Sequence, residues 1–337
     1  MALVEAEGLR KVFRLPVKEP GLGGAVKHLF VRRHRDVVAV DGVNLVIEAG
    51  EAVAYVGPNG AGKSTTVKLL TGILVPTAGR VLVDGVEPHR DRRANARQIG
   101  VLFGQRSQLW WDLPVRESLA LLRDMYGLGA REYAERLERF DAVLDLGDLL
   151  PVLARKLSLG QRMRADLAAA LLHDPRVVYL DEPTIGLDIA VKDRVRAFLR
   201  ELRAGGTTIM LTTHDLGDME DVCERLVVID RGRIIYDGAL AAVKDRFARD
   251  RRMHLVLAEP VPHAVVAARL PRAEVVAGGT ATEFTVVFDR FGHTAGEVIA
   301  ALLPLAEVVE LRIDEPAIED VVRKVYAGEL SLDGDPA

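Results

Sequence analysis

The chain has 337 residues, of which 49% are hydrophobic and 28% charged, and this predicts a globular protein of two domains. Its formal net charge of -4 argues against a protein held on DNA or RNA by phosphate neutralisation, so we expect no nucleic-acid partner. The single cysteine, Cys223, excludes an intrachain disulfide framework or thiolate metal cluster and fits an inert, partly buried thiol in a reducing compartment.

The first predicted elements are strands that lead to a glycine-rich loop. Alternation and β-branched residues predict strands at 3–14, 37–48 and 51–56, and the third runs directly into the loop. A helix at 62–71, strands at 81–83 and 99–103, and a mostly helical region over 115–150 are expected to follow.

Residues 16–36 are expected to form an insertion between the first two strands. Val26, Leu29, Phe30 and Arg33 fall at helical spacing, which predicts a short amphipathic helix with a basic end. Such a helix would lie either against anionic headgroups or a membrane partner, or simply on its own domain.

The rest of the chain alternates strands and helices. Strands at 176–181, 207–212 and 225–230, with helices at 190–203 and 215–223, predict βαβ order around a largely parallel, buried sheet. A linker helix at 241–252 is expected next. Residues 253–330 follow a split βαβ order, which predicts a small α+β ferredoxin-like module before a flexible tail at 331–337.

The loop between the third strand and its helix is a complete phosphate-binding pattern. Its residues are Gly57, Pro58, Asn59, Gly60, Ala61, Gly62, Lys63 and Ser64. The glycines allow backbone turns that aim N–H groups at an anion, and Lys63 adds a charge for the β- and γ-phosphates. Ser64 offers a hydroxyl oxygen to Mg²⁺. The loop predicts binding of a nucleoside triphosphate.

Three positions after strand ends are candidates for the chemistry. Asp181 follows an apolar strand and can hold Mg²⁺, while Glu182 is placed to polarise the attacking water. Gln105 can ligate Mg²⁺ or hold a water, and it begins an irregular stretch to Pro114 that we interpret as a sensor. His214 can reach the γ-phosphate and report its presence.

A turn at residues 157–161, here called the signature turn, precedes an apolar helix. Ser158 is a good N-cap, and Gly160 lets a backbone approach closely, so the helix start presents N–H groups to an anion. Because the chain's own phosphate loop is a different helix start, this anion is expected on a neighbouring chain. Asp188 is placed to contact that chain.

Together, in this order, these motifs resemble the nucleotide-binding subunit of an ATP-binding cassette (ABC) transporter over about residues 1–240. The resemblance implies an α/β P-loop NTPase fold of the ABC-ATPase type. Its parts would be a RecA-like core, an antiparallel β subdomain and a helical subdomain at about 106–172. ATP and Mg²⁺ are the implied cofactors, and the implied partners are a second cassette, expected to be another copy of this chain, and a separate transmembrane permease.

In that family two cassettes close head-to-tail, so Ser158, Gly160 and Gln161 of one chain would grip the ATP bound to the other. The resemblance carries Thr65 and Asp188 over as further ATP contacts. It also implies that Phe13 stacks on the adenine ring. Phe30 is the other candidate for this role, and the alternative interpretation of Phe13 is a side chain in the core. The signature turn departs from the commonest form at Leu159, where a glycine is usual.

Trp110 and Trp111 lie on the stretch that, in the family, receives a cytoplasmic helix of the membrane subunit. Because adjacent residues of an extended segment face opposite ways, we expect at most one at this interface and the other in the core.

The start of the chain has no basic segment followed by an apolar core, and no apolar run reaches the roughly 20 residues that span a bilayer. Any work at a membrane is therefore expected to need another chain, and the resemblance implies a cytoplasmic protein that is peripheral on the inner face of the membrane.

The whole pattern is similar to the ATPase subunits of prokaryotic exporters of drugs, antibiotics or other amphiphiles. A soluble ABC ATPase acting on ribosomes or nucleic acid is the alternative, although such relatives usually carry two cassettes or a long coiled coil. A P-loop kinase is a third interpretation, against which Glu182 and the signature turn argue.

Overall fold

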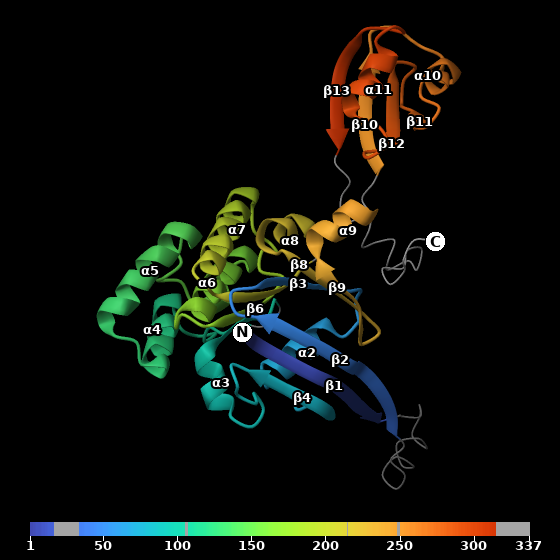
Figure 1. The fold of residues 1–337 in the computed structure, drawn as a ribbon. Coiled ribbons are helices and arrows are strands. Elements are labelled where there is room, and N and C mark those ends of the chain that lie inside the picture. The colour runs from blue at the N-terminus through green and yellow to red at the C-terminus, as the bar shows by residue number, and fades with distance from the viewer. Residues whose placement is uncertain (17–33, 105–106, 214, 248–249, 315–337) are drawn as a thin grey trace, which may run out of the picture. The chain divides into compact units, whose positions relative to one another are not determined.

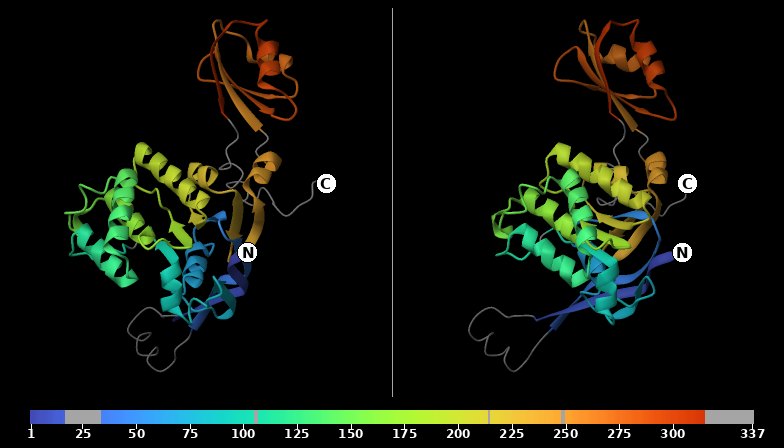
Figure 2. Two further views of the ribbon diagram at one scale, coloured as in Figure 1. Left: turned by 60° about the vertical axis from the view of Figure 1, so that its left-hand side comes forward. Right: turned by 90° about the vertical axis from the view of Figure 1, so that its left-hand side faces the viewer.

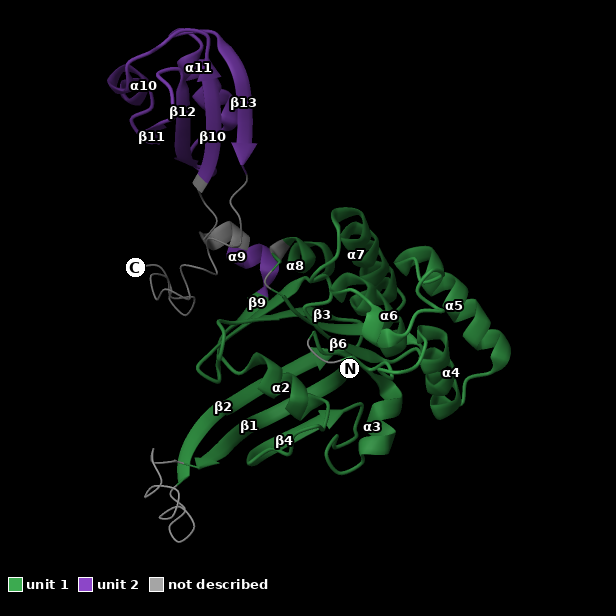
Figure 3. Ribbon diagram, turned by 180° about the vertical axis from the view of Figure 1, so that it is seen from behind, with its two compact units in different colours: residues 1–238 green, residues 239–337 purple. Residues whose placement is uncertain are grey.

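The computed structural model describes residues 1–16, 34–104, 107–213, 215–247 and 250–314. The chain forms two compact units, residues 1–238 and 239–337 (Figure 3), and each is considered by itself. Several expectations lie outside the described residues. They are Gln105, His214, most of the insertion at 16–36 including Phe30, and the tail.

Unit 1 contains two sheets. The antiparallel sheet has the order β2-β1-β4 and consists of β1 (Ala2–Pro16), β2 (His34–Glu48) and β4 (Ala78–Val83). The six-stranded sheet has the order β5-β6-β7-β3-β8-β9, and β5 to β8 pair in parallel. Its strands are β3 (Ala52–Val56), β5 (Ile99–Leu102), β6 (Val177–Asp181), β7 (Thr208–Thr212), β8 (Arg225–Asp230) and β9 (Arg233–Ala239).

The helices of unit 1 surround the six-stranded sheet. They are α2 (Lys63–Leu70), α3 (Arg92–Gln98), α4 (Val115–Tyr126), α5 (Ala130–Leu144), the 3-10 turn η1 (Ala154–Lys156), α6 (Leu159–Leu171), α7 (Ile189–Ala204) and α8 (Leu216–Val222). Helix α2 packs on the antiparallel sheet, whereas α7 and α8 lie on the opposite side of the six-stranded sheet (Figure 1). Helices α4 and α5 project to one side of the core (Figure 2).

The main hydrophobic core lies between the two sheets and explains the buried strands. Every residue of β3 is buried, as expected for a central parallel strand covered on both faces. Val53 and Tyr55 from β3 join Val67 and Leu70 of α2 and side chains from both sheets. This packing holds the loop between β3 and α2 on a rigid base.

Unit 2 confirms the predicted ferredoxin-like order. Its elements are α9 (Leu240–Phe247), β10 (Asp250–Leu257), α10 (His263–Arg269), β11 (Glu274–Ala277), β12 (Glu283–Asp289), α11 (Ala295–Leu302) and β13 (Val308–Asp314). The antiparallel sheet has the order β11-β12-β10-β13. Met253, Leu255, Phe284 and Val286 form a separate core with the two helices.

Some boundaries differ from the predictions. The linker helix expected at 241–252 ends at Phe247, and β10 already begins at Asp250. Pro16 pairs with His34, so the first two strands extend into both ends of the expected insertion. Helix α3 and strand β9 were not predicted from the sequence. Among the described residues, no helix combines the length and apolar character needed to cross a membrane.

Candidate functional site

The phosphate loop joins β3 to α2 and is shaped by glycines. Gly62 is the N-cap of α2 with a φ of 113°, a conformation that side chains with a Cβ rarely adopt. A Cβ at Gly62 would also lie 2.5 Å from the carbonyl oxygen of Ala39. Glycine is therefore required here on two grounds, and the loop can wrap an anion at the start of α2.

Lys63 is the cation of this loop. Its Nζ donates hydrogen bonds to the carbonyl oxygens of Gly57 and Pro58, the latter at 3.2 Å. Burial lowers the pKa of Lys63, and the carboxylates of Glu182 and Asp181 oppose that effect. The lysine thus lies within the electrostatic reach of both carboxylates predicted to do the chemistry.

The acidic pair lies at the C-terminal end of β6. Asp181 accepts a hydrogen bond from the Thr212 hydroxyl at the end of β7. The backbone N–H of Glu182 donates to the Thr212 carbonyl at 2.9 Å, and Glu182 has a φ of 56°. A non-glycine residue in this left-handed region is strained by about 1–3 kcal/mol, which is characteristic of functional positions.

One cavity of about 330 Å³ brings the predicted site together. Its lining includes Ser64 and Lys68 from α2, Gly104 after β5, and Asp181 and Glu182 after β6. Gln105 itself lies outside the described residues, but its neighbour Gly104 is part of this lining. The loop and the acidic pair therefore meet at one edge of the parallel sheet.

A buried aspartate, missed by the sequence analysis, supports this edge. Asp218 on α8 is 1% exposed, and its carboxylate accepts hydrogen bonds from the hydroxyls of Thr184 and Thr213. Arg196 on α7 also donates to it, at 2.7 Å. Thr184 lies two residues after Glu182, and Thr213 directly precedes His214. No sequence signal distinguishes Asp218 from an ordinary helix-surface acid.

The signature turn has the local structure expected of it. Ser158 is the N-cap of α6, and its hydroxyl accepts from the Gln161 N–H at 3.3 Å. The Gln161 side chain accepts from the Ser158 N–H at 2.9 Å, which completes a capping box. Gln161 is thus engaged within its own turn.

Gly160 is packed against the loop that follows the acidic pair. A Cβ at Gly160 would lie 2.4 Å from the carbonyl oxygen of Gly186, so only glycine fits. Leu159, the departure from the usual signature, lies on the other side of the contact, with its side chain beside Gly186. The signature turn and the 182–188 loop of one chain are therefore in direct contact.

Neither Ser158 nor Gly160 lines the cavity that holds Ser64 and Glu182. Asp188 caps α7 by accepting from the Val191 N–H at 3.0 Å. Phe13 is half-buried on β1 rather than in the core, with the Lys11 ammonium 5.4 Å from its ring centroid.

The two tryptophans do not divide between surface and core. Trp110 is 40% exposed and Trp111 is 52% exposed, so the expectation that one of them is buried is wrong. The reason is the backbone, because the Leu113 N–H donates to the Trp110 carbonyl and closes a turn, whereas the expectation assumed an extended segment. Leu109 supplies the buried anchor instead.

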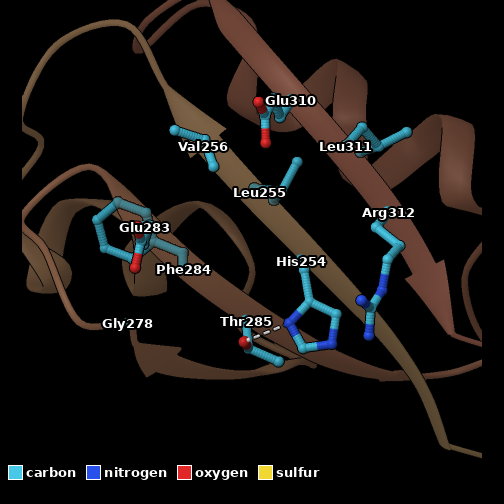
Figure 4. A pocket seen from close by; sticks show the side chains of 10 residues that line it. All are labelled: His254, Leu255, Val256, Gly278, Glu283, Phe284, Thr285, Glu310, Leu311 and Arg312. Carbon is cyan, nitrogen blue, oxygen red and sulfur yellow. Dashed lines mark hydrogen bonds between the residues drawn. The ribbon is translucent and has the colours of Figure 1, made fainter.

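A second cavity, of about 360 Å³, lies in unit 2 and shares no residue with the site of unit 1. His254 is central to it, and its Nδ1 is 2.9 Å from the Thr285 hydroxyl (Figure 4). Glu283, Glu310 and Arg312 also line it.

Cys223 is the expected inert thiol. It is buried, and burial raises its pKa to about 12, so it is protonated and unreactive at neutral pH.

Strands β3 and β6 deliver a phosphate loop and an Asp-Glu pair to the same edge of one parallel sheet, which defines a nucleotide-hydrolysing P-loop ATPase. Similarity to known proteins identifies the family within this class. Residues 40–185 match the family model described as ABC transporter. The chain is 35% identical to the daunorubicin resistance ATP-binding protein of Streptomyces coeruleorubidus over 291 residues, which is 86% of this chain and 92% of the relative.

It is also 38% identical to the Nod factor export ATP-binding protein I of Burkholderia lata, over 62% of this chain and 68% of that one. A solved dimer of an ATP-binding cassette in a post-hydrolysis state, bound to ADP and Pi, superposes with a TM-score of 0.59 and 25% identity. That match covers 70% of this chain and 98% of the cassette. The chain belongs to the family of ABC transporter ATP-binding proteins, and it is an ATPase subunit of a transporter.

Proposed function

We propose that two copies of this chain close head-to-tail around two ATP molecules and drive a separate membrane permease that exports an amphiphile of the drug or antibiotic class. The observation that carries the ATPase part is the single cavity shared by Ser64, Asp181 and Glu182.

We propose a task for each residue of the site. The N–H groups at the start of α2 and the Lys63 ammonium hold the phosphates. Glu182 accepts a proton from, or polarises, the attacking water. Asp181 is kept in place by the Thr212 hydroxyl. Phe13, half-buried on β1, stacks on the adenine.

The site fits Mg²⁺ as the metal. Ser64 and Asp181 offer a hydroxyl and a carboxylate oxygen to one cavity, and hard oxygen ligands of this kind suit Mg²⁺. When bound there with ATP, the ion would neutralise charge on the phosphates. Gln105 is a further proposed ligand, adjacent in sequence to Gly104 of the cavity.

The argument for a dimer rests on what lies outside that cavity. Ser158 caps a helix whose first N–H groups have no partner within the helix, yet neither it nor Gly160 lines the chain's own site. Around the signature turn and the 182–188 loop, Leu159, Ile185 and Ile189 are 50%, 46% and 80% exposed. A second copy, with its ATP, is proposed to cover these side chains and to use Ser158.

A separate permease is part of the proposal because the family model is that of a transporter and a relative is named for export, and we propose that the chain lies on the cytoplasmic face of a membrane. The exposed Trp110 and Trp111 are the proposed contact. The cargo class rests on relatives named for daunorubicin resistance and Nod factor export. Those names do not favour a soluble ATPase acting on ribosomes or nucleic acid.

The test is purification of the tagged chain from its native host in mild detergent. We expect a multi-spanning membrane protein to co-purify, and vesicles holding both proteins to expel a cationic amphiphilic dye only with ATP. Co-purification with ribosomes or nucleic acid, and no ATP-dependent dye movement, would contradict the transport assignment.

A further inference from the structure

A buried carboxylate fastens the tryptophan segment, defined here as residues 107–114, to the helix that begins at the signature turn. Asp166 on α6 is 4% exposed. Its Oδ1 accepts hydrogen bonds from the Ser107 hydroxyl at 2.9 Å and from the Gln108 N–H at 2.8 Å. Burial raises the pKa of the Asp166 carboxyl, and these hydrogen bonds act in the opposite direction.

The same helix contacts the segment a second time, one turn nearer to Ser158. The Arg162 guanidinium lies 5.0 Å from the ring centroid of Trp111, a cation–π distance. Arg162 and Asp166 are four residues apart and so share one face of α6. Two side chains of a single rigid element therefore hold the same short segment.

The segment is also joined to the chain that leads into the signature turn. The Arg155 N–H donates to the Trp111 carbonyl at 3.1 Å, and the Ala154 N–H donates to the Leu113 carbonyl at 3.0 Å. On its other side, the Trp110 N–H donates to the buried Ser118 hydroxyl of α4 at 3.2 Å. The segment has few independent ways to move.

We propose that Asp166 is a positioning residue that makes the tryptophan segment follow α6, so that engagement of Ser158 by a second copy's ATP is transmitted to Trp110 and Trp111. This inference rests on the proposed head-to-tail dimer. It goes beyond that dimer because it names the hydrogen bonds to Asp166 as the contact that transmits movement of the signature turn to the surface facing the permease. Loss of the Asp166 contact would leave the signature turn and the tryptophan segment folded, but movement of one would no longer be transmitted to the other.

The chain contains its own reporter for this motion. Trp110 and Trp111 are the only two tryptophans, so intrinsic tryptophan fluorescence arises from this segment alone. In the full chain carrying Glu182→Gln, which blocks hydrolysis, we expect Mg-ATP to produce a dimer by light scattering and a shift or intensity change in tryptophan emission.

The variants are Asp166→Ala and the milder Ser107→Ala, which leaves α6 unchanged and removes one donor to Asp166 together with the acceptor of the Leu109 N–H. Each is expected to reduce the ATP-dependent fluorescence change by threefold or more, with ATP-dependent dimerisation as strong as before or stronger. The double variant Ser107→Ala/Asp166→Ala should lose no more than Asp166→Ala alone, because the Ser107–Asp166 hydrogen bond is already absent from Asp166→Ala. Arg164→Ala is the matched control, since Arg164 lies on α6 but donates to the carbonyls of Leu144 and Asp145.

Several results would overturn the proposal. One is an undiminished fluorescence change in a folded Asp166→Ala chain. If Asp166→Ala unfolds at a lower temperature than the parent, an undiminished change in Ser107→Ala is the result that counts. Others are additive losses in the double variant, or a loss in Arg164→Ala as large as in Asp166→Ala. Dimerisation without any emission change in the parent would refute this inference alone, whereas absence of ATP-dependent dimerisation would refute the proposed function.

Discussion

The Asp218 carboxylate accepts a hydrogen bond from the Thr184 hydroxyl, and both residues are buried. Thr184 follows Glu182 by two residues, and the same carboxylate holds Thr213, the residue before His214. One side chain on α8 therefore braces the segments that carry the two residues predicted to act on the terminal phosphate and its water.

Asp218→Asn should lower kcat while leaving ATP affinity nearly unchanged. The amide keeps the shape but can accept fewer of these hydrogen bonds, so Glu182 loses its exact placement, which we expect to cost about 10- to 100-fold in kcat. Steady-state ATPase assays and calorimetric ATP titration would separate the two quantities. Asp221→Asn, a change at a half-exposed neighbour on the same helix, is the control. Equal loss in both variants, or weaker ATP binding in Asp218→Asn, would count against a positioning effect.

Glu182→Gln should keep ATP binding, trap the ATP-bound dimer and reduce turnover by about 100- to 10,000-fold, because the amide cannot accept a proton from water. Phosphate release and size-exclusion chromatography with Mg-ATP are the measurements. Normal turnover would exclude Glu182 as the base.

Lys63→Ala should weaken nucleotide binding itself. Losing a charge-assisted contact with phosphate costs about 1.5–3 kcal/mol, which corresponds to roughly 10- to 150-fold in Kd. Titration with a fluorescent ATP analogue measures this, and Lys192→Ala, which removes a half-buried ion pair with Asp215, is the control. Unchanged affinity would refute the phosphate assignment.

Trp110→Ala and Trp111→Ala should uncouple ATPase from transport while basal hydrolysis of the purified chain persists. An exposed aromatic that fills a partner's pocket contributes about 2 kcal/mol or more to binding. Transport in vesicles is the measurement, and Phe291→Ala, another exposed aromatic in unit 2, is the control. Wild-type transport by both tryptophan variants would contradict the docking surface.

His173 should make folding sensitive to pH. Its ring stacks on Tyr126 at 3.9 Å, its Nε2 lies 2.9 Å from the Ile99 carbonyl oxygen, and burial lowers its pKa to about 4. The folded pKa is below the unfolded value of 6.5, so the unfolded chain binds the proton first. This part of the stability is present above about pH 6.5 and is lost as the pH falls toward 4.

We expect a loss of about 1–3 kcal/mol in the free energy of unfolding of unit 1 from this residue over that window. His173→Phe keeps the stack and should flatten the pH dependence in urea denaturation at pH 7.5 and pH 5.0. His263→Phe, at an exposed histidine of unit 2, should not. An equally steep dependence in His173→Phe would assign the effect to other groups.

The features that depend on local sequence patterns were predicted correctly. The phosphate loop, the capped signature turn and the order of the ferredoxin-like module all depend on residues close together in the chain, and the structure has each of them. The linker helix was predicted to be too long because residues 250–252, at the start of β10, are charged or polar and show no strand pattern. These residues join the strand because the backbone of β10 pairs with β12 and β13.

The supporting carboxylates could not be predicted for a related reason. Asp166 and Asp218 lie on helices where acids are usually solvated, and their burial follows from partners 58 and 34 residues away along the chain. The prediction that Trp110 and Trp111 face opposite ways was wrong for a local reason, because they lie in a turn and not in an extended segment.

Gly160 has no room for a methyl group because the Gly186 carbonyl fills that space. In the proposed closed pair, the signature turn that contacts the neighbour's nucleotide and the loop that follows the chain's own Glu182 would then move as one body. If the pair closes as proposed, release of phosphate from one site would also weaken the contacts at the other, and the two sites would hydrolyse ATP in coordination.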